Sequence, residues 1–137
     1  MAIVNKVQKS GHMDLWDITQ FQILLYCHLT KVDISDSDLD CLTLLALNGE
    51  SELTAFCNAA CNEEERDRTH NLVFERYIYK TPQSVRNSIN KIENKKLIIK
   101  RGKSKKKILV NPDMKVQTEG NIFVEVKFLR KNDAKES

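Results

Sequence analysis

Residues 81–112 read TPQSVRNSINKIENKKLIIKRGKSKKKILVNP and contain three structural signals in succession. Thr81 is a favourable N-cap, because its side-chain oxygen can accept a hydrogen bond from the first helical turn. Pro82 suits the first helical position, where its missing N–H would have no intrahelical partner and its fixed φ matches the helix. We therefore predict a helix over residues 82–95.

One face of this predicted helix is apolar. Val85, Ile89 and Ile92 recur at spacings of four and three, which places them on a single stripe. We expect this stripe to be buried beneath the helix, together with Leu97. The positions that point the other way are polar: Gln83, Arg86, Asn87, Asn90, Lys91 and Asn94.

A basic hairpin is predicted directly after the helix, over residues 97–110. Two short apolar runs, LII and ILV, flank a turn that contains Gly102, and Asn111 with Pro112 ends the second run. This is the pattern of two short strands joined by a hairpin loop. Eight cationic residues lie on the hairpin or next to it: Lys95, Lys96, Lys100, Arg101, Lys103, Lys105, Lys106 and Lys107.

The string SVRNSINKIENKKLIIKRGKSKKKILV, residues 84–110, resembles the recognition helix and wing of winged helix-turn-helix DNA-binding domains of the MarR-like sort. The resemblance implies that helix 82–95 lies in the major groove and that hairpin 97–110 contacts phosphates. Arginine suits guanine edges, asparagine and glutamine suit adenine edges, and lysines supply phosphate contacts. The DNA-binding residues expected on this basis are Gln83, Ser84, Arg86, Asn87, Asn90, Lys91, Arg101, Lys103, Lys105, Lys106 and Lys107.

The charge distribution favours a polyanionic partner for this part of the chain. The net charge of +3 over 137 residues conceals a strong asymmetry. Residues 1–81 hold 7 Lys/Arg and 13 Asp/Glu, a net charge of −6, whereas residues 82–107 hold 10 and 1, a net charge of +9. Residues 108–137 hold 5 of each sign. A local excess of positive charge is typical of a surface that contacts nucleic acid, here double-stranded DNA.

Two helices are predicted in the first third of the chain. Residues 17–29 are densely apolar with little β-branching and favour a buried helix, although residues 21–26 alone would also fit a strand. Residues 39–47 are rich in leucine. Serine and aspartate precede this run and Gly49 follows it, which supplies start and stop signals for one helix.

The sequence leaves open which helix supports the predicted recognition helix. Residues 50–62 form a third predicted helix, with Leu53, Phe56 and Cys57 on one face. Residues 64–74 could fill the same role. The segment between Asn62 and Thr81 is longer than the short turn of a minimal winged domain.

Two strands are predicted near the chain ends. Residues 3–7 form a possible edge strand, and residues 120–129 alternate apolar and polar side chains as a half-buried strand does. The second strand needs a partner, which could be the N-terminal strand, the hairpin sheet, another protein or another copy in a homodimer. We expect one domain over residues 1–130 and a polar tail over residues 131–137.

Several functional classes are disfavoured by the sequence. No run approaches the roughly 20 apolar residues of a membrane span, and the N-terminus lacks the apolar centre of a signal peptide, so we expect a cytoplasmic protein without membrane contact. The chain has four glycines and no phosphate-binding glycine loop, nucleophile elbow or metalloprotease helix. We therefore expect no enzymatic activity and no cofactor.

The cysteines predict neither disulfides nor a metal site. Cys27, Cys41, Cys57 and Cys61 lie within apolar helical patterns and are expected to be reduced core residues. Cys57 and Cys61 are spaced to share a helix face, but a structural zinc site needs a second pair of ligands, which the sequence lacks.

These observations predict an α+β fold, a winged helix-turn-helix with three or more helices, a small antiparallel sheet and an added C-terminal strand. The expected function is double-stranded DNA binding, as a transcriptional regulator of prokaryotic or phage type. The alternative is a non-enzymatic protein-interaction module that reuses the scaffold, for instance as a virion or assembly component.

Overall fold

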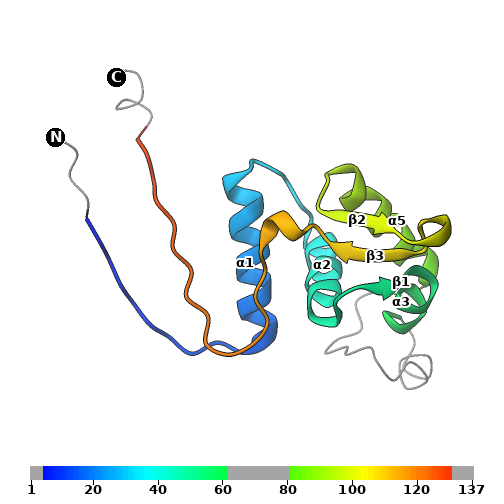
Figure 1. The fold of residues 1–137 in the computed structure, drawn as a ribbon, viewed down its shortest axis with the longest axis horizontal. Coiled ribbons are helices and arrows are strands. Elements are labelled where there is room, and N and C mark those ends of the chain that lie inside the picture. The colour runs from blue at the N-terminus through cyan, green and yellow to red at the C-terminus, as the bar shows by residue number, and fades with distance from the viewer. Residues whose placement is uncertain (1–4, 62–80, 131–137) are drawn as a thin grey trace.

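The computed structural model describes residues 5–61 and 81–130, and these form an α+β fold (Figure 1). The described part of the chain contains four α-helices and a three-stranded antiparallel sheet. In chain order the elements are α1 (Leu15–Leu29), α2 (Asp36–Asn48), β1 (Ser51–Glu52), α3 (Leu53–Ala59), α5 (Pro82–Asn94), β2 (Ile98–Arg101), β3 (Lys107–Val110), and two 3-10 turns, η1 (Lys103–Lys105) and η2 (Pro112–Met114).

The helix predicted over residues 17–29 is confirmed as α1, which also resolves residues 21–26 as helical. It begins two residues earlier than expected, because the Asp14 side chain caps it by accepting a hydrogen bond from Asp17 N at 2.8 Å. The leucine-rich helix is α2. Ser35 Oγ accepts a hydrogen bond from Asp38 N at 3.3 Å at its start, and Gly49, with φ of 76°, ends it.

The core is built on α2, which lies between α1 and α5 (Figure 1). Leu42, Leu44 and Leu45 of α2 are fully buried. They belong to one apolar cluster with residues from every neighbouring element: Trp16, Ile23, Phe56, Val85, Ile89, Ile92, Leu97, Ile98 and Ile108. The predicted burial of Leu97 and of the apolar stripe of α5 is therefore confirmed.

The sheet has the order β1-β3-β2. The predicted hairpin is confirmed: β2 and β3 are antiparallel, with Ile98 opposite Val110. The third strand, β1, was not predicted. It is only two residues long and places Ser51 opposite Ile108, and the pairing continues where Leu53 N donates to Lys106 O at 2.7 Å. Pairing to β3, and not local propensity, makes this strand.

Two predicted strands find no partner within the described part of the chain. Residues 120–129 and the described part of the N-terminal segment, residues 5–7, have no ladder partner among the described residues. Alternation of apolar and polar residues indicates that a segment favours the extended conformation. A strand forms only where a second backbone lies beside it and supplies hydrogen bonds. Residues 3–4 and the polar tail 131–137 lie outside the described residues.

The helix predicted over residues 50–62 begins later, at Leu53, because β1 occupies the preceding two residues. Its N-terminus is capped by Glu52, whose carboxylate accepts hydrogen bonds from Thr54 N at 3.2 Å and Ala55 N at 2.8 Å. This helix, α3, packs on α5, as α2 does. The alternative supporting helix, residues 64–74, lies outside the described residues.

After the sheet, the chain returns to the other end of the molecule. Residues that follow η2 run along α1 (Figure 1), where the buried Gln22 holds them. Gln22 Nε2 donates to Gln117 O and Gln22 Oε1 accepts from Gln117 N, both at 2.8 Å. Gly120, with φ of 67°, then redirects the backbone, and residues 121–130 extend away beside α1.

Candidate nucleic-acid interface

Helix α5 is fixed at both ends. At its N-terminus Thr81 Oγ1 accepts from Ser84 N at 3.2 Å, which half-buries Ser84 in the cap. At its C-terminus Lys96 adopts a left-handed φ of 64°, and Leu97 N donates back to Ile92 O at 3.0 Å. This is a Schellman motif formed without glycine. The helix is therefore a rigid platform for the side chains on its outer face.

Gln83 and Asn87 form a pair on the exposed face of α5. Gln83 Nε2 donates to Asn87 Oδ1 at 3.0 Å, one helical turn away. Within the described residues the Asn87 amide nitrogen and the Gln83 amide oxygen have no further partner. The pair thus leaves one donor and one acceptor open to solvent, which is the set that an adenine edge requires.

Arg86 lies in a different environment from its neighbours. Its guanidinium donates to Thr54 Oγ1 of α3 at 2.9 Å, and the residue is half-buried. The bond ties α5 to its supporting helix across 32 positions of sequence. The Arg86 guanidinium is thus bonded to α3 at the surface, although the sequence placed it on the outer face with the potential base contacts.

Asn90 and Lys100 join α5 to the hairpin. Lys100 Nζ lies 3.4 Å from Asn90 Oδ1 and 3.3 Å from Glu93 Oε1. The Lys100 side chain starts on the inner face of β2, as Ile98 does, and its charged end reaches the rim of α5. The polar face of the helix is therefore continuous with the hairpin. Lys91 is exposed on the same helix.

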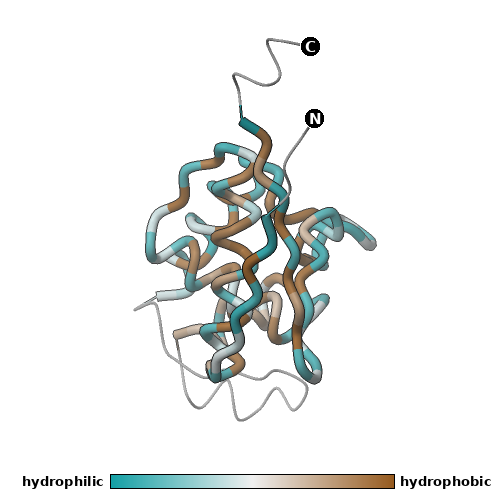
Figure 2. Tube along the Cα trace, turned by 90° about the vertical axis from the view of Figure 1, so that its left-hand side faces the viewer, coloured by the Kyte–Doolittle hydropathy of each residue, from teal (hydrophilic) through white to brown (hydrophobic). Residues whose placement is uncertain are grey.

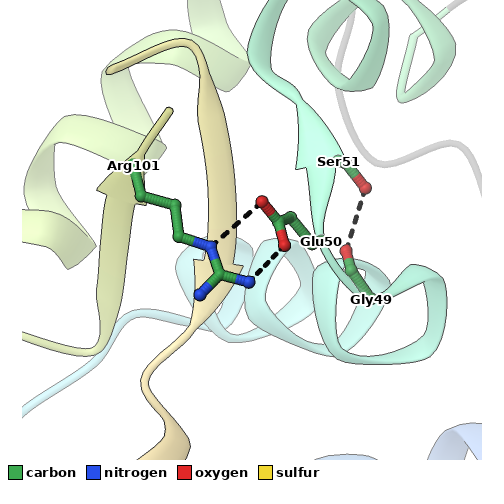
Figure 3. A network of polar contacts seen from close by, with 4 residues as sticks. All are labelled: Gly49, Glu50, Ser51 and Arg101. Carbon is green, nitrogen blue, oxygen red and sulfur yellow. Dashed lines mark hydrogen bonds and ion pairs between the residues drawn. The ribbon is translucent and has the colours of Figure 1, made fainter. Parts of the chain in front are cut away.

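Arg101 is the second predicted contact that is held by the protein itself. Its Nε donates to Glu50 Oε1 at 3.0 Å and its Nη2 to Glu50 Oε2, a two-pronged ion pair (Figure 3). The Arg101 guanidinium lowers the pKa of the Glu50 carboxyl below its ordinary value. Glu50 stands just before β1, so the ion pair links the two outer strands across β3.

The hairpin loop presents the remaining cations. Gly102, Ser104 and Lys105 all have positive φ, of 86°, 59° and 54°, which produces a tight η1 turn. Among the described residues the exposed loop lysines make no ion pair with a carboxylate. These are Lys103, Lys105 and Lys106 between the strands and Lys107, the first residue of β3. The turn between β2 and β3 lies at the end of the molecule farthest from α1 (Figure 1).

Sequence reasoning missed the groups that hold this surface in place. Glu50, Thr54 and Glu93 each bind a cationic side chain of α5 or β2, and two of these pairs span 32 and 51 positions. Only the spacing of Glu93 and Lys100, which are near in sequence, carries any local signal. The other two contacts depend on β1, which has no sequence signature.

The predicted core position is confirmed for three of the four cysteines. Cys27, Cys41 and Cys57 are buried, Cys61 is half-buried, and all four are free thiols. Burial raises the pKa of Cys57 to about 11, which keeps the thiol neutral at physiological pH. Within the described ranges no three histidine, cysteine or acidic side chains gather as a metal site would require.

Comparisons of the chain with protein-family models, with curated proteins and with solved structures give no match. In residues 5–61 and 81–130 no helix has the length and apolar character needed to cross a bilayer.

Proposed function

We propose that residues 36–110 form a winged helix-turn-helix and that the protein binds double-stranded DNA, as a transcriptional regulator of prokaryotic or phage type. The proposal is supported by the order helix α2, strand β1, helices α3 and α5, then the β2–β3 hairpin, with β1 paired to the far strand of that hairpin. On this proposal α3 and α5 are the helix pair and the hairpin is the wing.

One observation carries the DNA proposal. An exposed, hydrogen-bonding face of α5 adjoins the tip of the hairpin, where four exposed lysines form no salt bridge with the described residues. Helix α5 would enter the major groove, and the loop lysines would contact the phosphates on one side of it. The acidic first half of the chain limits this attraction to one end of the molecule.

On the proposal, the residues of this surface have different roles. Gln83 and Asn87 would contact base edges, since they retain an open donor and acceptor. Arg86 and Arg101 would position α5 and the wing, since their guanidinium groups are bonded to Thr54 and Glu50. Lys91 and the loop lysines would supply the phosphate contacts.

Binding to a pool of duplexes with a randomised centre tests the proposal. The full chain should retain duplexes at low salt and enrich a subset of sequences. Replacing Gln83 and Asn87 with alanine should abolish that enrichment, at a cost of about 1 to 3 kcal/mol on the preferred site only. Replacing Arg86 with alanine should lower thermal stability, with a smaller change in sequence preference. A parent protein that retains no duplex at low salt would refute the proposal.

A second candidate is favoured by a different observation. The exposed large hydrophobic side chains of the described residues lie on or beside α1, away from the basic hairpin. A non-enzymatic protein-interaction or assembly module would use such a surface and would not need DNA. It predicts a protein partner for the α1 end and no retention of duplexes by the parent.

A further inference from the structure

Exposed apolar side chains are concentrated at one end of the molecule. Every exposed large hydrophobic residue among those described lies on α1 or in the extended segments beside it. They are Val7, Met13, Leu15, Phe21, Leu24, Leu29, Phe123, Val124, Phe128 and Leu129. Figure 2 views the molecule from this end, with hydrophobic stretches along α1 and the C-terminal segment. Clustering of this kind marks an interaction surface.

The C-terminal segment, residues 121–130, is poised for strand pairing. It is anchored to the body through Gln22 and Gln117, turns at Gly120, and then extends with no hydrogen-bonded strand beside it in the described residues. Phe123, Phe128 and Leu129 are 74%, 78% and 78% exposed. An apolar strand with open N–H and C=O groups binds another strand readily.

The segment is complementary to a second copy of itself. In an antiparallel pair that is centred on Val126, each residue faces the residue equally far on the other side of that centre. Glu125 then faces Lys127 of the second copy, and the reciprocal pair repeats on the other side of the axis. Val124 faces Phe128 and Phe123 faces Leu129, so that apolar residues also meet.

Neighbouring registers lack this match. Centring the pair on Glu125 brings two glutamates together, and centring it on Lys127 brings two lysines together. Centring on Val124 places Glu125 against Phe123. A shift by a single residue places Glu125 opposite Phe128 in one direction and opposite Val126 in the other, so the pairing of Glu125 with Lys127 is lost. Val126 is therefore the centre that satisfies both charge and hydrophobicity.

Helix α1 supplies the second layer that such a pair needs. A two-stranded ribbon is marginal alone in water and requires an apolar surface beneath it. The extended segments and α1 border an open groove whose lining includes Val7, Met13, Ile18, Phe21, Phe123 and Phe128. In the ribbon, one face would carry Ile122, Val124, Val126 and Phe128 of both copies, with Arg130 opposite Ile122 at each end.

We propose that the chain forms a two-fold symmetric homodimer in which residues 122–130 of two copies pair as antiparallel strands about Val126, over the exposed face of α1. The interface lies at the end of the molecule opposite the basic hairpin. It is independent of DNA binding, and its test needs no nucleic acid.

Charge reversal tests the register. Glu125→Lys places lysine at both positions 125 and 127, and Lys127→Glu places glutamate at both. In a dimer of either single variant, residues 125 and 127 of the two copies therefore carry like charges. Sedimentation of the full chain should show a dimer that dissociates on dilution. Each single variant should dissociate at concentrations at least about tenfold higher, because four charges of one sign meet at the centre. Thermal melting of the monomer should not change, since both side chains are exposed.

Two combinations should restore the dimer. The double variant Glu125→Lys, Lys127→Glu exchanges the charges within one chain and recreates both pairs. An equimolar mixture of the two single variants should form a heterodimer, since the two lysines of one variant then face the two glutamates of the other. A parent that stays monomeric at high concentration, or a mixture that stays monomeric, would overturn the proposal.

Disulfide trapping tests the axis independently. In a Cys61→Ser background, which removes the half-exposed thiol, Val126→Cys should form a disulfide-linked dimer on mild oxidation. Val124→Cys is the matched control, because the two copies of residue 124 would be separated by four residues of strand, about 13 Å. Equal cross-linking of the two variants would contradict the register.

Discussion

The two ends of this molecule use the same kinds of side chain in opposite ways. At the α5 and hairpin end, the large apolar side chains Val85, Ile89 and Ile92 are buried, and lysines form the surface. At the α1 end, Phe21, Leu24 and the aromatic residues of the C-terminal segment are exposed. The α5 end therefore buries its large apolar side chains and has a charged surface. The α1 end leaves large apolar side chains exposed to water, which folding normally avoids.

The difference indicates two contact surfaces of different chemistry. The cationic end suits a polyanion, whose binding weakens with salt, and the apolar end suits a protein surface, whose binding depends little on salt. Helix α2 separates them, with α1 on one side and α5 on the other. Substitutions at one end should therefore leave the other unaffected, and this independence can be tested.

The largest effect is expected from placing the same charge at a buried and an exposed apolar position. Ile89→Asp should unfold the domain, since an unpaired carboxylate in the core costs several kcal/mol against a total stability of about 5 to 15 kcal/mol. Asn90→Asp, at the adjacent exposed position, should melt close to the parent. Phe123→Asp should also leave the monomer fold intact. Far-UV circular dichroism with temperature measures all three, and a parent-like melt for Ile89→Asp would show the apolar stripe to be misassigned.

Removing the N-cap of α5 at the cationic end and the N-cap of α1 at the apolar end should cost equal stability. The two changes should reduce DNA affinity unequally. Thr81→Ala and Asp14→Ala each delete a side chain that accepts a hydrogen bond from the first turn, at a cost of about 1 kcal/mol in urea unfolding. Only Thr81→Ala loosens the helix proposed to enter the groove. A loss of duplex affinity in Asp14→Ala of the same size would break the independence of the two ends.

The smallest effect is expected at the Glu50–Arg101 ion pair. Glu50→Gln should raise affinity for duplex DNA slightly, because it releases the Arg101 guanidinium at the cationic end. Asp14→Asn makes the same change in net charge at the α1 end and should have less effect. If both variants bind equally, net charge and not position governs binding.

The same ion pair has a defined pH dependence. Arg101 lowers the pKa of Glu50, whose ordinary value is 4.5, so the folded state binds a proton less readily than the unfolded state. The stability that the pair contributes is present above pH 4.5 and is lost as the pH falls through the lower, folded-state pKa. The difference in melting temperature between the parent and Glu50→Gln should therefore disappear in acid.

Much of the cationic end could be predicted from sequence because its signals are local. Thr81 and Pro82 mark the start of α5, the spacing of Val85, Ile89 and Ile92 defines its buried face, and the turn at Gly102 defines the hairpin. Each of these depends on residues within one or two turns of the chain. The propensities that set them are therefore visible without a partner.

The remainder depends on contacts that are distant in sequence. Strand β1 exists because β3 offers it an edge, Arg101 is held by Glu50 across 51 positions, and Gln22 binds Gln117 across 95. Residues 120–129 show the converse, since their alternating pattern predicts a strand and the described chain provides no edge for it. The local sequence pattern indicates which secondary structure a segment can adopt. Whether the segment adopts it depends on a partner elsewhere in the structure.

The central claim, that the cationic end binds DNA through its phosphates, is tested most directly by the salt dependence of duplex affinity. The variant replaces four hairpin lysines with alanine: Lys103, Lys105, Lys106 and Lys107. The control removes the same charge from lysines elsewhere on the exposed surface: Lys6, Lys9, Lys31 and Lys115.

Each phosphate contact that is lost should lower the slope of log affinity against log salt by about 0.9. The hairpin variant should therefore have a slope smaller than that of the parent by about 3 to 4, while the control retains nearly the parent slope. Equal slopes for the parent and the hairpin variant, or equal reductions in the variant and the control, would contradict the claim.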